Sequence, residues 1–125
     1  MKKEVKQVKK TEVKVIDAQG KILGRVASEA AMTLMGKTKA SFERNTYCGF
    51  PVKIINASKL SITPKKLTQI YHTRYSGIPG GLRVLPGTET AMKKGLKELI
   101  KLAVYKMLPS NKLRRTMMKS LKITD

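Results

Sequence analysis

Apolar residues recur along the chain with two spacings, and the helical spacing defines three segments. Between residues 23 and 35 they recur every three or four positions, which predicts an amphipathic helix that ends at Gly36. The same spacing predicts one helix over 88–108, ended by the proline that follows, and a shorter helix over 113–121. Segment 37–50 lacks a helical spacing and is expected to be irregular or partly extended.

Extended segments are predicted between these helices. Residues 13–16 form a short β-type run, and 52–56 is nearly continuous and β-branched, which is typical of a strand covered on both faces. A second short strand is expected at 60–62, and 66–75 is interpreted as extended. Three glycines and a proline make 76–82 a loop.

This order predicts one α/β domain over residues 13–125 with basic outer surfaces, preceded by a flexible basic arm at 1–12. A transit peptide is the competing interpretation of the arm. Such segments avoid acidic residues, whereas Glu4 and Glu12 occur here, so the arm is preferred.

Charge is the strongest compositional signal. The 125 residues include 27 Lys and Arg against 8 Asp and Glu, a formal net charge of +19. A chain this basic is expected to act against a polyanion, and 41% hydrophobic residues suffice for a folded core. One cysteine, one histidine and the lack of a long apolar run argue against disulfide scaffolds, zinc modules and membrane proteins. We expect no metal, cofactor or small-molecule substrate.

Motifs that suggest enzymes are weak. Gly36-Lys37-Thr38 resembles the end of a phosphate-binding loop, but it closes a helix instead of opening one. The GXXG at 77–80 matches a KH-domain loop, which should lie between two helices. His72 lacks an evident partner for general-base catalysis, and Cys48 is expected to be a buried or partly buried thiol. We therefore predict no catalytic residue.

The basic residues favour nucleic acid. No acidic residue occurs between Glu43 and Glu89, although seven Lys and Arg lie there, and Tyr71, His72 and Tyr75 interleave with them. Planar rings beside arginines suit stacking on unpaired bases, and unpaired cations suit phosphates. The segment from residue 106 onward is also strongly basic.

Four segments carry a family resemblance. They are VIDAQGKILGRVAS at 15–28, INASKLSITPKKL at 55–67, RYSGIPGGL at 74–82 and VYKMLPSNKLRR at 104–115. In this order they closely resemble the large-subunit ribosomal protein thirteen family in its bacterial form. The resemblance implies a three-layer α/β domain with a small, mostly parallel sheet between helices. It also implies binding to large-subunit ribosomal RNA early in assembly, beside neighbouring large-subunit proteins, in the cytoplasm.

The resemblance also implies which residues contact RNA. By position these are Lys37, Lys39, Lys65, Lys66, Arg74, Ser76, Gly77, Gly80, Gly81, Lys106, Asn111, Lys112 and Arg115. The charge and aromatic pattern adds Arg44, Tyr75, Arg83, Arg114 and Lys119. Three positions depart from the family pattern: Pro64 and Arg114 replace glycines, and Tyr75 replaces a histidine.

Two other functions compete with the ribosomal one. A basic RNA- or DNA-binding protein acting off the ribosome would carry the same charge. A small phosphate-ester enzyme would have to use His72.

Overall fold

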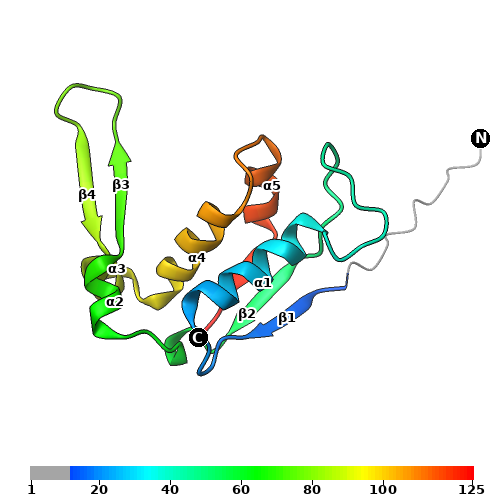
Figure 1. Ribbon diagram of the computed structural model, residues 1–125, viewed down its shortest axis with the longest axis horizontal. Helices are drawn as coiled ribbons and strands as arrows, with labels where there is room; N and C mark the ends of the chain where they lie inside the picture. Colours follow the sequence, from blue (N-terminus) through cyan, green and yellow to red (C-terminus); the bar gives the residue numbers. More distant parts are fainter. Residues whose placement is uncertain (1–11) are drawn as a thin grey trace, which may run out of the picture.

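The computed structural model describes residues 12–125, so the predicted arm lies, apart from Glu12, outside the described residues (Figure 1). In chain order the elements are β1 (Lys14–Asp17), α1 (Leu23–Met35), β2 (Val52–Ile55), the 3-10 helix η1 (Ala57–Lys59), α2 (Pro64–Gln69), β3 (Tyr71–Tyr75), β4 (Leu82–Pro86), α3 (Gly87–Lys94), α4 (Leu96–Met107), α5 (Leu113–Lys119) and β5 (Leu121–Ile123). The expected α/β class is confirmed.

A small parallel sheet has the order β1-β2-β5, as the resemblance implied. Its register aligns Ile16, Ile54 and Ile123 in one row, and the first two are fully buried under the helices. The alternate residues Lys53 and Lys122 form a row on the opposite face and are exposed. The prediction that residues 52–56 are covered on both faces is therefore wrong, and this face of the expected three-layer arrangement is open.

The core lies between the sheet and the helix pair α1 and α4, which run side by side (Figure 1). Ala30 and Leu34 of α1 and Ile100 and Val104 of α4 have no exposed surface. Alanines on α1 let the two helices approach closely, which is why so short a chain buries a continuous core.

The predicted helix over 88–108 is divided in two at Gly95. This residue has φ +76° and ψ 175°, a backbone conformation that other residues rarely adopt, and its N–H donates to Ala91 O at 2.9 Å. The break turns α3 away from the axis of α4. As a consequence Met92, which continues the apolar stripe in the sequence, is 88% exposed.

The extended interpretation of 66–75 is wrong in its first half and correct in its second. Pro64 occupies the first turn of α2, where its missing N–H costs nothing, and the helix ends at Gln69. β3 then pairs with β4 as an antiparallel hairpin, and residues 76–81 form its tip. The expected strand at 60–62 is reduced to a single bridge between Ser61 and Ile22.

The third predicted helix is shorter than expected. α5 ends at Lys119, and Leu121 belongs to β5, where it pairs with Val52. Leu121 and Ile123 face the core with Lys122 between them, a period-two pattern that overrides the four-residue spacing from Met117.

Candidate nucleic-acid interface

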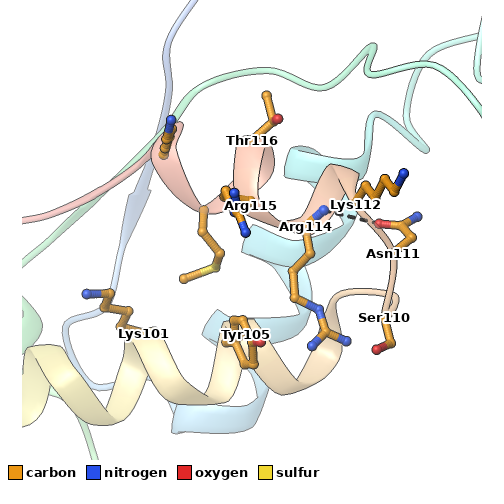
Figure 2. Close-up of a pocket in the computed structure, with 10 residues that line it drawn as sticks. Lys101, Tyr105, Ser110, Asn111, Lys112, Arg114, Arg115 and Thr116 are labelled. Atoms are coloured by element: carbon orange, nitrogen blue, oxygen red, sulfur yellow. Dashed lines mark hydrogen bonds between the residues drawn. The ribbon is translucent and has the colours of Figure 1, made fainter.

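The turn between α4 and α5 forms a basic groove (Figure 2). Its volume is about 920 Å³, and none of the residues that line it is acidic. The lining residues are Lys101, Tyr105, Ser110, Asn111, Lys112, Arg114, Arg115, Thr116, Met118 and Lys119. All the predicted contacts between 111 and 119 therefore lie together, and we call this set the junction groove.

Arg114 shapes the junction groove from within. Its Nε donates to Pro109 O and its terminal NH₂ to Leu108 O, both at 3.0 Å, so the guanidinium holds the two carbonyls that follow α4. Pro109 O also accepts the Asn111 N–H at 2.9 Å. The guanidinium lies over the Tyr105 ring, 4.5 Å from its centroid, as Figure 2 shows. Asn111 accepts the Arg114 N–H through Oδ1 at 3.1 Å, two residues before α5 begins at Leu113. Arg114 is thus a structural clamp whose remaining N–H donors are free for an anion.

The loop after α1 adds two cations beside this turn. Lys37 and Arg44 line a hollow of about 350 Å³ whose opposite wall includes Asn111. Tyr47 anchors the loop, because its hydroxyl donates to Ser120 Oγ at 2.9 Å. Lys39 lies apart from this hollow, with its Nζ 3.8 Å from the centroid of the Phe50 ring. Segment 37–50 is irregular, as predicted.

The β3–β4 hairpin carries the second group of predicted contacts and projects from the opposite end of the molecule (Figure 1). Arg74 and Arg83 are directly opposite one another in the antiparallel register, and both are exposed. Like charges in this arrangement repel, so an anion between or above them is stabilising. At the tip Gly80 has φ +78°, and a Cβ at Gly81 would lie 1.8 Å from Ser76 Oγ.

Lys65 and Lys66 lie in the first turns of α2, below the hairpin. Lys66 and Lys106 line a largely apolar groove of about 660 Å³ together with His72. Lys106 therefore faces the base of the hairpin, and the structure does not bring it into the junction groove with Lys112. Burial, and then the charge of Lys106, lower the pKa of His72 below its ordinary value. Both ring nitrogens are buried and lack a hydrogen-bond partner among the described residues.

No predicted contact takes part in an ion pair within residues 12–125. Ion pairs there join Lys21 to Glu29, Lys93 to Glu89 and Lys97 to Asp125, all outside the predicted set. Glu43 does line the hollow shared by Lys37 and Arg44, and Glu89 and Glu98 line a hollow with Arg74. The described part of the chain also holds no cluster of three or more His, Cys, Asp or Glu residues that could bind a metal. None of its helices combines the length and apolar character needed to cross a membrane.

Comparison with known proteins decides the family. The model of the family described as ribosomal protein L13 matches residues 11–124, nearly the whole chain. The chain belongs to the ribosomal protein L13 family. Relatives named large ribosomal subunit protein uL13 are 46% identical over 108 residues in Natranaerobius thermophilus and 42% identical over 125 residues in Pelobacter propionicus. These alignments cover 86% and 98% of this chain and 75% and 87% of the relatives.

The structure accounts for two of the departures from the L13 pattern. Pro64 begins α2 and so uses its fixed φ where a helix needs it. Arg114 caps α4, and its side chain fills the inner wall of the junction groove. Tyr75, at the third departure, is 62% exposed on the hairpin.

Sequence reasoning missed cations that the L13 fold adds to these surfaces. Lys101 lines the junction groove from α4, four residues before Tyr105. The sequence does place Lys101 on the same face of the helix as Tyr105. That face could be assigned to the groove only once the path of the α4–α5 turn was known. Lys53 and Lys122 share the open face of the sheet, a pairing that required the β2–β5 register.

Proposed function

We propose that this L13-family protein is a structural constituent of the large ribosomal subunit that binds large-subunit ribosomal RNA and supports early assembly. The relatives are named as proteins of that subunit. From its membership of the same family, we infer that the chain works in the cytoplasm, in the ribosome, beside neighbouring large-subunit proteins.

Cations without an ion-pair partner among residues 12–125 gather at two separate ends of the folded core, and this arrangement supports the proposal most directly (Figure 1). The junction groove, with Lys37 and Arg44 beside it, forms one end, and the Arg74–Arg83 pair forms the other. A protein with two such surfaces contacts phosphates of separate RNA segments and fixes their relative positions. Its mechanism is electrostatic, since it neutralises phosphates where RNA segments converge.

The salt dependence of RNA binding tests this mechanism. With about 6–10 phosphates contacted, affinity for large-subunit RNA should fall roughly three to five decades between about 50 and 200 mM salt. Arg74→Gln with Arg83→Gln should reduce the slope of log K against log salt by about 2, one for each lost contact.

The matched control is Lys93→Gln with Lys97→Gln, which removes the same charge from residues already paired with Glu89 and Asp125. Its slope should stay close to that of the wild-type chain. Equal slopes for both double variants would show that net charge, rather than the hairpin surface, binds the RNA. A binder acting off the ribosome is separated by co-sedimentation with large subunits at high salt, where non-specific contacts are lost.

A further inference from the structure

The β3–β4 hairpin has two chemically different faces. Residues directly opposite one another in an antiparallel pair share a face, so Arg74 and Arg83 lie on one side with His72 and Leu85. The other side carries Tyr71, Thr73 and Tyr75 from β3 and Leu82, Val84 and Pro86 from β4. This second side has no charged residue, and we call it the apolar face.

The apolar face is open in the isolated chain. Four of its residues are between 57% and 63% exposed, so the other elements of residues 12–125 leave more than half of each uncovered: Tyr71, Tyr75, Leu82 and Val84. Together they expose on the order of 500 Å² of largely apolar side chain, a patch of the size that marks interaction sites on soluble proteins. A two-stranded hairpin is at best marginally stable in water, so covering this face would stabilise it.

The distribution of charge indicates what covers the apolar face. RNA brings phosphates, and every arginine of the two strands lies on the other face. Tyr71 and Tyr75 can stack on bases, but Leu82 and Val84 on the partner strand offer RNA neither a cation nor a stacking ring. The face as a whole therefore matches an apolar protein surface better than RNA. A second copy of this chain is disfavoured, because a patch of this size is below the roughly 800 Å² per partner of a stable complex.

We propose that the apolar face docks on an apolar surface of a neighbouring protein of the large subunit, while the arginine face contacts RNA. This inference rests on the proposed function, because the small contact needs both partners to be held on the same RNA. The hairpin then lies between RNA and protein. In this arrangement Tyr71 and Tyr75, whose rings were expected to stack on RNA bases, instead supply the rigid part of the protein contact.

The test uses two substrates for the full chain: large-subunit RNA freed of protein, and large-subunit particles assembled without this chain. Leu82→Thr with Val84→Thr removes apolar surface and keeps residues that β-strands accept. Its affinity for free RNA should stay within about twofold of wild type, whereas its affinity for the particles should fall about tenfold. Arg74→Gln with Arg83→Gln is the matched control on the other face and should weaken binding to both substrates.

Other outcomes overturn the inference. Equal loss on both substrates for the threonine double variant would mean that the apolar face contacts RNA bases. Unchanged binding to both would mean that nothing covers it. If the wild-type chain binds neither substrate, the proposed function itself fails. That result is distinguishable from the two outcomes above, because in those the wild-type chain still binds. Thermal melting confirms that the variants fold, since the changed side chains lie outside the core.

Discussion

Arg114→Lys tests whether the clamp at the end of α4 stabilises the fold. Lysine keeps the charge near the helix C-terminus, but it lacks the planar fork whose Nε and terminal NH₂ reach Pro109 O and Leu108 O, and it cannot stack flat on Tyr105. One lost hydrogen bond is worth about 0.5–1.5 kcal/mol and an exposed cation–π contact about 0.5–1 kcal/mol. We therefore expect a loss of roughly 1–2 kcal/mol in unfolding free energy, which lowers the melting temperature by roughly 3–10 °C at this chain length.

The assay is thermal and urea unfolding of the free protein, with Arg115→Lys as control. Arg115 is the neighbouring residue on α5, it is exposed, and its change should stay within about 0.5 kcal/mol. Combining Arg114→Lys with Tyr105→Leu should give less than the sum of the two effects, because both remove the same stack. An Arg114→Lys chain that melts with the wild type would refute the clamp.

Three further results are expected. The folded state disfavours protonation of His72, so the free energy of unfolding should fall as pH drops below the ordinary pKa of 6.5. His72→Leu should therefore reduce the difference in melting temperature between about pH 7.5 and about pH 5.5. An unchanged difference would show that His72 is not the source of the pH dependence. Gly80→Val strains a backbone at φ +78° and should weaken RNA binding at least as much as Arg74→Lys, with little change in melting temperature; normal binding would make the tip a spacer. Ile54→Ala removes a side chain with no exposed surface and should cost about 2–5 kcal/mol in urea unfolding; a loss below 1 kcal/mol would place Ile54 outside the core.

The spacing of apolar residues predicted an element correctly where those residues form one continuous buried face. The apolar spacing of 23–35 was sufficient for α1, because its alanines and leucine form one continuous buried stripe. The same reasoning failed at Gly95, where a single glycine interrupts a helical spacing that continues on both sides. The glycine was visible, but glycine inside a helix costs only about 1 kcal/mol, so sequence alone could not decide between tolerance and a break.

The candidate interface was predictable in composition but not in arrangement. Charge and resemblance selected Lys37, Arg44 and Asn111, yet their shared hollow depends on how the loop after α1 packs on the α4–α5 turn. Arg114 was selected for its charge, while its role as a clamp depends on carbonyls five and six residues earlier. The opposite chemistry of the two hairpin faces required the β3–β4 register, because a shift of one residue would mix them.

The strand order β1-β2-β5 has a consequence for synthesis of the chain. β2 is central and begins at Val52, and its second neighbour is β5, which begins only at Leu121. The sheet therefore stays incomplete on the translating ribosome until residues 121–123 have left the exit tunnel, whereas the β3–β4 hairpin closes through nearby residues. All residues of the hairpin thus leave the tunnel before α5, which the junction groove needs, has emerged.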